Sequence, residues 1–459
     1  MRRRIRALAA ALLLAAALLL AAALSGCGGF NIEFNPEELY ALPELPAKYT
    51  ELNAQLNAIL EDGAEYAAPA AGTNIQPVQL TDLDGDGQQE AVAFFRKAED
   101  EKPLKIYIFS AKGDRYEQSA VIEGSGASVY SVVYSDLDGD GRTELIVGWR
   151  VNAELQALSV YALDPAGPQE LLRSVSYVRY ASVDLDGDGL QELVVFHVGE
   201  EGGGVADYYD WQEGGTLQSV SSARLSVTMA ELNQGRVVSG TLRDGLPAVF
   251  ATGVTTPVSA ELAAAAVTDI LAAPEQELVN AALSSTTGVT SAVNAFRGLY
   301  PTDINGDGAI EVPSPAAAPR GGESDQRVDW KSYNGAGEET VVLRTYHNME
   351  DGWYLQLPES WTGRVEAERS STGSDTSVTF YVLDEMGIRK AAILRITALT
   401  GTGREVRATR GNRFPLSRQS DVIYTAELPE TPPWDQAMTA EEVRGAFNLI
   451  AREWIPGDN

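Results

Sequence analysis

The chain has 459 residues, a length that predicts about three structural units and excludes a single small domain. Its hydrophobic fraction of 44% and charged fraction of 22% are typical of globular proteins, which excludes a wholly disordered, collagen-like or multi-span membrane chain. Asp and Glu total 65 against 35 Lys and Arg, a net charge of −30 that would repel phosphates, so we expect no nucleic-acid partner. The single cysteine, Cys27, excludes an intrachain disulfide.

Residues 1–26 have the pattern of an export signal. Four arginines lie within residues 2–6, and residues 7–24 are only Ala and Leu. An uncleaved membrane anchor is the alternative interpretation, but no basic cluster follows the apolar run. The run ends instead at Leu24-Ser25-Gly26-Cys27.

This tetrapeptide resembles a bacterial lipobox. The resemblance implies that the Cys27 thiol receives a diacylglyceryl group and that the chain is cut just before it, leaving 31 basic against 65 acidic side chains, or −34. Two acyl chains give stable anchoring. We therefore expect an exported protein held by lipid on the outer face of the cell membrane, or on a periplasmic face if an outer membrane is present.

Two short segments follow. Residues 27–46 hold two glycines and three prolines with little periodicity, which predicts a tether. Residues 47–63 predict a helix that ends at Gly63, because apolar side chains recur at helical spacing at Tyr49, Leu52, Leu56, Ile59 and Leu60.

An acidic segment then recurs four times, at residues 81–90, 135–144, 183–192 and 302–311. The first aspartates lie at 82, 136, 184 and 303, so the last step is about twice the others and one copy is missing. Residues 240–248 stand in its place. There Asp244 and Gly245 align with Asp188 and Gly189, but the outer carboxylates are absent, so we expect this copy to hold no ion.

Apolar runs directly after the motif, at residues 91–95, 145–147 and 193–196, predict strands. Further strands are expected at 104–109 and 115–122, and again at 158–163 and 170–175. With the strand before each motif, this makes four strands in about fifty residues, the pattern of a β-propeller. We therefore predict a mainly β fold, with a propeller-like array of about five four-stranded blades over residues 70–348.

Two segments of the array are less regular. The alanine-rich residues 258–283 favour a helix by propensity, but the repeat register predicts strands at 267–271 and 277–280 around a turn at Pro274. Residues 313–322 predict a loose insertion before strands at 327–333 and 340–348.

Residues 349–459 predict a separate small α+β domain. Alternating strands are expected at 353–357, 377–383, 391–399 and 422–428. Thr439 and Glu442 form a capping-box pattern before one closing helix, whose apolar stripe is predicted to contain Val443, Phe447, Ile450 and Trp454.

The repeated motif, Asp-x-Asp-Gly-Asp-Gly-x-x-Glu, is suited to one hard cation. Carboxylates stand at positions 1, 3, 5 and 9, the carbonyl of position 7 can point inward, and the glycines permit a tight turn. Calcium takes six to eight oxygens, whereas the strict octahedron of magnesium fits less well. An EF-hand needs an acid at position 12, where this chain has Ala93, Val147, Val195 and Ser314.

The pattern resembles the FG-GAP/VCBS repeat, known from calcium-bearing blades of integrin α-subunit propellers and from bacterial surface proteins. The resemblance implies three strong calcium sites and one weaker site, in which position 3 is Asn. The implied ligands are Asp82, Asp84, Asp86, Gln88 and Glu90; Asp136, Asp138, Asp140, Arg142 and Glu144; Asp184, Asp186, Asp188, Leu190 and Glu192; and Asp303, Asn305, Asp307, Ala309 and Glu311, with position 7 contributing its carbonyl.

The alternative is that these segments are merely acidic turns. Against it, four carboxylates in one loop repel strongly without a cation, and no basic residue recurs at fixed spacing. The ion is therefore expected to be structural.

The sequence contains none of the usual motifs of a serine nucleophile, a zinc protease or a phosphate-binding loop. His197 and His347 are expected to be structural, and tryptophans such as Trp149, Trp211, Trp330 and Trp353 to be packing residues rather than sugar platforms. We therefore predict a non-catalytic binding or adhesion module for an envelope or host protein or glycan. The alternative is an envelope enzyme, acting on glycan or peptide, that uses the propeller as a scaffold.

Overall fold

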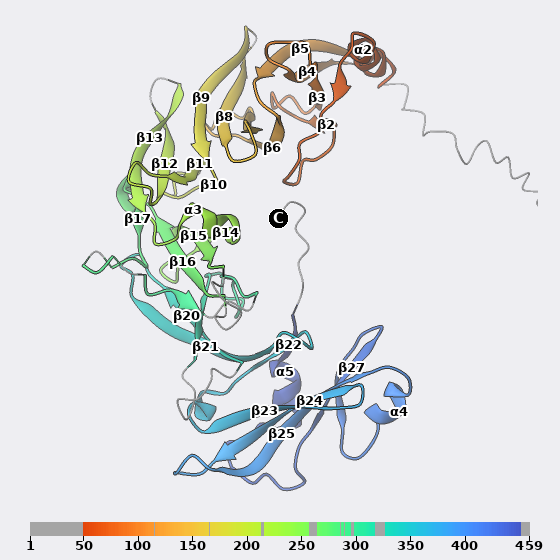
Figure 1. Ribbon diagram of the computed structural model, residues 1–459, viewed down its shortest axis with the longest axis vertical. Helices are drawn as coiled ribbons and strands as arrows, with labels where there is room; N and C mark the ends of the chain where they lie inside the picture. The colour runs from red at the N-terminus through yellow and green to blue at the C-terminus, as the bar shows by residue number, and fades with distance from the viewer. Residues whose placement is uncertain are drawn as a thin grey trace, which may run out of the picture. The chain divides into compact units, whose positions relative to one another are not determined.

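The computed structural model describes residues 49–450, except 114, 165, 213–214, 257–263, 285, 289, 295–297 and 317–325. The predicted export signal, Cys27 and the tether lie outside the described residues. The fold is mostly β, with antiparallel sheets of four or five strands that fit a propeller-like array, as predicted (Figure 1). No helix within the described ranges is both long and apolar enough to cross a membrane.

The predicted N-terminal helix is α2 (Thr50–Glu61). Leu52 and Leu56, one turn apart, are its buried residues, and Gly63 follows with a φ of +87°. Glycine suits this position because a left-handed residue commonly ends a helix.

Four consecutive antiparallel sheets, here sheets 1 to 4, follow the sequence repeat. Sheet 1 contains β1 (Glu65–Tyr66), β2 (Val78–Thr81), β3 (Glu90–Arg96), β4 (Leu104–Lys112) and β5 (Arg115–Gly124). Sheet 2 contains β6 (Ser128–Ser135), β7 (Glu144–Arg150), β8 (Gln156–Asp164) and β9 (Gly167–Tyr177). Sheet 3 contains β10 (Arg179–Val183), β11 (Glu192–Val198), β12 (Gly204–Gln212) and β13 (Thr216–Arg224). The strand expectations for these units are confirmed.

Sheet 4 contains the alanine-rich segment. Its members are β14 (Arg236–Thr241), β15 (Pro247–Val254), β16 (Ala266–Ala272), β17 (Val279–Asn280) and β18 (Val293–Asn294). The short helix α3 (Met229–Asn233) precedes β14, and the 3₁₀ turn η2 (Pro274–Gln276) joins β16 to β17. The prediction of strands is confirmed, because pairing of β16 with β15 outweighs the helix propensity of alanine.

Sheet 5 crosses the predicted domain boundary. Its order is β19 (Val312–Pro315), β20 (Arg327–Tyr333), β21 (Glu339–Asn348), β22 (Trp353–Gln356) and β28 (Phe447–Leu449). The boundary expected between residues 348 and 349 therefore falls inside one sheet.

The predicted loose insertion is wrong at its start, because residues 313–315 belong to β19. Pro313 lies opposite Trp330, and Pro315 lies opposite Val328. Prolines are tolerated here because β19 is an edge strand, where a missing N–H costs no ladder bond on the open side.

In the strand that follows each acidic motif, side chains point alternately to two buried faces, which explains why the sequence of that strand is continuously apolar. In β7, Val147 packs in a core shared with sheet 1, whereas its neighbour Ile146 packs in a core shared with sheet 3. Similar shared cores join sheets 3 and 4 and sheets 4 and 5. Since successive side chains point to opposite faces, a strand buried on both faces must be apolar throughout.

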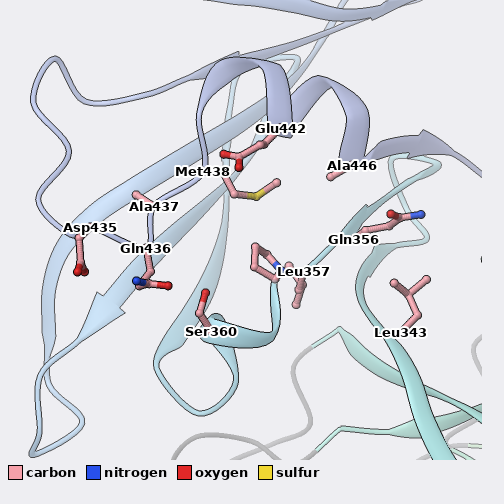
Figure 2. A pocket seen from close by; sticks show the side chains of 11 residues that line it. Leu343, Gln356, Leu357, Ser360, Asp435, Gln436, Ala437, Met438, Glu442 and Ala446 are labelled. Atoms are coloured by element: carbon pink, nitrogen blue, oxygen red, sulfur yellow. The ribbon is translucent and has the colours of Figure 1, made fainter.

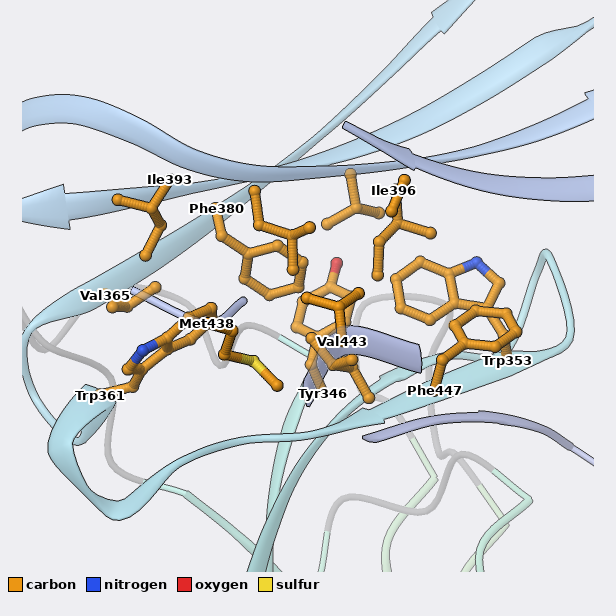
Figure 3. Packing of buried hydrophobic residues seen from close by; sticks show 14 of the residues in the cluster. Tyr346, Trp353, Trp361, Val365, Phe380, Ile393, Ile396, Met438, Val443 and Phe447 are labelled. Atoms are coloured by element: carbon orange, nitrogen blue, oxygen red, sulfur yellow. The ribbon is translucent and has the colours of Figure 1, made fainter. Parts of the chain in front are cut away.

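Sheet 6 forms the body of the C-terminal part. It contains β23 (Val365–Thr372), β24 (Asp375–Leu383), β25 (Arg389–Thr400), β27 (Val422–Glu427) and β26 (Phe414–Arg418), with η3 (Glu359–Trp361) before β23 and α4 (Arg404–Ala408) after β25. Its core gathers side chains from sheets 5 and 6 and from α5 (Ala440–Ala446), among them Trp353, Phe380 and Val443 (Figure 3).

The closing helix is shorter than predicted. The capping box is present: Thr439 Oγ1 accepts from the Glu442 amide over 3.3 Å, and Glu442 Oε2 accepts from the Thr439 amide over 2.7 Å. Phe447, however, belongs to β28 and pairs with Leu355, so it is not part of a helical stripe. Sheet pairing overrides the helical period here, while the Phe447 ring still enters the core. Ile450 follows β28, and Trp454 is outside the described residues.

Candidate metal centres

We name the segments 82–90, 136–144, 184–192 and 303–311 the first, second, third and fourth loops. The first loop joins β2 to β3, the second joins β6 to β7 and the third joins β10 to β11, and the last residue of each loop begins the later strand. Strand pairing closes each loop at its base, as in the pairing of Ser135 with Glu144. The fourth loop is closed by an isolated bridge between Thr302 and Glu311. Each loop is therefore a tight hairpin with a fixed opening.

The position-1 aspartate folds every loop in the same way. Its two carboxylate oxygens accept hydrogen bonds from the amides of the glycines at positions 4 and 6, with donor–acceptor distances of 2.7 to 3.1 Å. These aspartates are Asp82, Asp136, Asp184 and Asp303. The glycines have φ between +73° and +94°, a region in which a side chain is strained, which explains glycine at both positions.

The position-9 glutamate is the buried base of each loop. Glu90, Glu144, Glu192 and Glu311 are at most 3% exposed. In each, Oε2 accepts from the amide of position 2, over 2.6 to 3.2 Å. Oε1 of Glu192 and of Glu311 is buried without any hydrogen-bond partner. A buried carboxylate oxygen without a donor is costly, so these atoms favour a cation as their partner.

Burial also changes the ionisation of these glutamates. It raises the pKa of Glu144, Glu192 and Glu311 to about 7, and the neighbouring loop aspartates add to that increase. Burial likewise raises the pKa of Glu90 and of Asp138. The hydrogen bond from the position-2 amide lowers the pKa of all four glutamates in part, but burial has the larger effect. A bound cation would favour the charged form and release these protons.

The loops differ in how closely their carboxylates gather. In the third loop all four predicted carboxylates, Asp184, Asp186, Asp188 and Glu192, offer oxygens within 4.8 Å of one another. The first loop brings together its three aspartates without Glu90, and the second brings together Asp136, Asp138 and Glu144 without Asp140. Among the described residues, the carboxylates of the fourth loop do not gather this closely.

No basic side chain neutralises these groups in the described ranges. None of the loop carboxylates forms an ion pair there, and the one arginine within a loop, Arg142, pairs instead with Asp164. The negative charge of each loop is therefore left for solvent or a cation.

The residues at position 7 were predicted to contribute a backbone carbonyl. The structure places the amides of Gln88, Arg142, Leu190 and Ala309 against the position-5 aspartates, with distances of 2.7 to 2.9 Å. This bond fixes the backbone at position 7 whatever its side chain. The carbonyl ligand itself stays a prediction.

The degenerate copy, residues 240–248, contains the end of β14, a short turn at residues 242–246 and the start of β15. The Leu242 amide donates to the Leu246 carbonyl over 2.8 Å, and Asp244 Oδ2 accepts from the Gly335 amide over 2.9 Å. Asp244 thus has a structural hydrogen bond to the turn between β20 and β21. The turn also contacts the fourth loop, since the Ile310 amide donates to the Thr241 carbonyl over 2.9 Å.

Sequence reasoning missed two residues beside the third loop. Gln276, in η2, donates from Nε2 to Asp186 Oδ2 over 3.1 Å. Asp210, in β12, is 6% exposed, and the charges of Asp186 and Asp188 contribute to its raised pKa, although burial contributes more. Neither lies in the motif. Only strand register, which pairs Leu193 with Tyr209, places Asp210 next to Glu192.

Two of the cavities among the described residues differ in their relation to the loops. One of about 150 Å³ opens beside the second loop and is lined by Asp138, Asp140, Glu144 and Trp211, among others. The other, of about 420 Å³, lies in the C-terminal part, where Met438 and Leu357 face the space and the Glu442 carboxylate lies at its edge (Figure 2). It contains no loop carboxylate and is separate from the metal centres.

The histidines have structural partners. His197 Nε2 lies 2.8 Å from Asp207 Oδ2, while His347 is 2% exposed, hydrogen-bonds to Thr345 and stacks on Tyr354. Trp149, Trp330 and Trp353 are buried in packing positions, as expected, and Trp211 is half-buried.

Residues 82–147 match the family model of an FG-GAP-like repeat. The match begins at the first aspartate of the first loop and ends in β7, so it contains the first and second loops. The predicted resemblance to FG-GAP repeats is confirmed for this segment. No curated protein matches the chain.

Proposed function

We propose that the loops bind Ca²⁺ and that the loaded array is a lipid-anchored, non-catalytic module that binds a protein or glycan outside the cell. One observation carries the calcium part of this proposal. Carboxylates converge at the first three loops, and the glutamate at the base is buried without a basic partner. A divalent cation would compensate this charge, and its ligands would come from both ends of the hairpin.

The donor set favours calcium over magnesium. Each of the first three loops has four carboxylates, and the position-7 carbonyl is the predicted fifth ligand. These are all hard oxygen ligands, and they suit the six to eight oxygens that calcium takes better than the strict octahedron of magnesium. The fourth loop has Asn305 at position 3, so it has one negative charge fewer. We expect this site to be weaker, and the overall affinity to be that of extracellular modules, roughly 10⁻⁴ to 10⁻³ M.

Thermal unfolding of the full chain tests the calcium proposal. We expect excess chelator to lower the melting temperature and millimolar calcium to restore it, because an ion that binds only the folded state stabilises it. An unchanged melting curve would contradict the proposal. Glu144→Gln should remove one equivalent of bound calcium, whereas Asp244→Asn, in the degenerate copy, should leave the stoichiometry unchanged.

Support for a binding module comes from the sheet architecture and the net charge of −30, which suit a stable, exposed, anionic surface. Arrays of envelope glycans and proteins, probed with and without calcium, test this part. Calcium-dependent retention of a defined glycan or protein is the expected result. Turnover of an arrayed substrate would instead favour the alternative, an envelope enzyme.

The anchor is tested separately. Metabolic labelling with a fatty acid should mark the wild-type protein and not Cys27→Ser, which should also leave the membrane fraction. Labelling that persists in the variant would contradict lipid attachment at this residue.

A further inference from the structure

The third loop differs from the other loops in its surroundings. Glu192 is 1% exposed, and its Oε1 atom is buried without a partner. The Tyr208 hydroxyl, on the adjacent strand β12, is also buried without a partner in a fully buried side chain. Burial raises the pKa of this phenol, and the charges of Glu192, Asp186 and Asp210 and the interaction of its hydroxyl with Glu192 act in the same direction. The Glu192 carboxylate and the Tyr208 hydroxyl therefore lie together, both buried, at the base of the third loop.

Asp210 adds a fifth carboxylate at this point. Leu193 pairs with Tyr209 in the ladder between β11 and β12, so the next position sets Glu192 beside Asp210. Asp210 Oδ1 accepts from the Trp211 amide over 2.6 Å, and Oδ2 accepts from Gln212 Nε2 over 3.4 Å. No Lys or Arg in the described ranges pairs with it.

The other copies have no acid at the corresponding register position. Their ladders pair Ala91 with Phe109, Leu145 with Tyr161, and Val312 with Lys331. The residues one step further along, equivalent to Asp210, are Ser110, Ala162 and Ser332. The fifth carboxylate is thus specific to the third loop among the four copies.

We infer that Asp210 belongs to the third metal centre and makes it the tightest calcium site of the chain. The inference rests on the proposed calcium binding and extends it by ranking the sites. Affinity of calcium sites increases with charge and rigidity, and this centre gathers four loop carboxylates where the first and second loops gather three, with Asp210 beside them. A buried carboxylate without a cation is unfavourable, so the bound ion gains from its presence.

Calorimetric titration of the chelator-stripped full chain with Ca²⁺ tests the ranking. We expect Asp210→Asn to weaken the tightest phase about tenfold, as outer-shell substitutions at metal sites do, without changing the stoichiometry. Asp207→Asn is the matched control, because Asp207 lies three residues away on β12 and bonds to His197 and Ser222 instead. The control should keep wild-type affinity.

The reverse substitution adds a second, independent readout. Ala162→Asp places a carboxylate at the equivalent position of the second loop and should tighten one of the weaker phases. Thermal melting in excess chelator checks that the variants fold. Asp210→Asn should be at least as stable as wild type, because it removes a charge that repels Asp186 and Asp188. If the Asn variant does not fold, Asp210→Ser replaces it in the titration.

The outcomes distinguish the proposed calcium binding from the ranking of the sites. Absence of calcium binding to the wild-type chain would overturn the proposed function together with the ranking. Calcium binding whose tightest phase is unchanged in both Asp210→Asn and Asp210→Ser would overturn the ranking alone.

Discussion

The Thr143 amide donates a hydrogen bond to the Leu83 carbonyl over 2.9 Å, which joins the second loop directly to the first. The contact is close: a Cβ added to Gly85 would lie 2.5 Å from the Gly141 carbonyl oxygen. A similar approach joins the second and third loops, where a Cβ on Gly139 would lie 2.6 Å from the side chain of Leu190. The first three candidate centres therefore lie where neighbouring sheets touch, and an ion that fixed one of these loops would also restrict its neighbour.

Gly85→Ala tests this loop-to-loop contact. The positive φ costs about 1 to 2 kcal/mol for a non-glycine residue, and the clash with Gly141 adds about 1 to 3 kcal/mol. Gly87→Ala is the matched control, since Gly87 has φ of +85° but open space around its Cβ position. Urea unfolding in excess calcium should show the larger loss for Gly85→Ala. Equal losses would mean that the contact between the loops contributes nothing.

Arg142→Ala tests the role of position 7. If the ligand there is the backbone carbonyl, the side chain is dispensable, as the alanine at position 309 already indicates. The Arg142–Asp164 pair is partly exposed, so its loss should cost under about 1 kcal/mol. Calcium titration should give wild-type stoichiometry and affinity within about twofold. Loss of one equivalent would show that the side chain, not the backbone, is needed.

Asp269 predicts a pH dependence. It is fully buried in β16, where its Oδ2 accepts from the Ser226 amide over 2.8 Å and its Oδ1 accepts from Asn280 Nδ2 over 2.7 Å. Burial raises its pKa, although these hydrogen bonds lower it in part. With the folded pKa above the unfolded one, the stability linked to its protonation is present below the unfolded value and is lost as pH rises through the folded value.

Asp269→Asn removes that titration. The free energy of unfolding of wild type, relative to the variant, should therefore fall as pH rises from about 4. Chemical unfolding at a series of pH values, with calcium saturating, measures the difference. A difference that increases with pH would contradict the assigned direction of the pKa shift.

Phe447→Ala tests the strand that replaces the end of the predicted helix. The Phe447 ring lies 5.7 Å from Trp353 and 5.5 Å from Tyr424 between ring centroids, inside the core of sheets 5 and 6. Its truncation should cost about 3 to 5 kcal/mol of unfolding free energy. Asn448→Ala, at the next position of β28, should cost much less, because Asn448 is only half-buried and bonds within its own segment. Similar losses for both variants would argue against packing of the ring.

The four loops were readable from sequence because their geometry is local. Asp82 bonds to the amides of Gly85 and Gly87 within the same six residues, and every copy repeats this pattern. The strands after the loops were readable too, since a strand buried on both faces requires an uninterrupted apolar run, as in Ile146 and Val147.

Tertiary structure alone decided the rest. Phe447 follows a helical pattern, yet it pairs with Leu355, far earlier in the chain, and residues 313–315 form a strand despite two prolines because a partner, β20, is available. Asp210 lies eighteen positions after Glu192, and only the register of β12 against β11 brings it to the third loop. Local hydrogen bonds and side-chain periodicity are determined by neighbouring residues. Strand partners depend instead on which distant segments bury apolar surface together, and no short stretch of sequence contains that information.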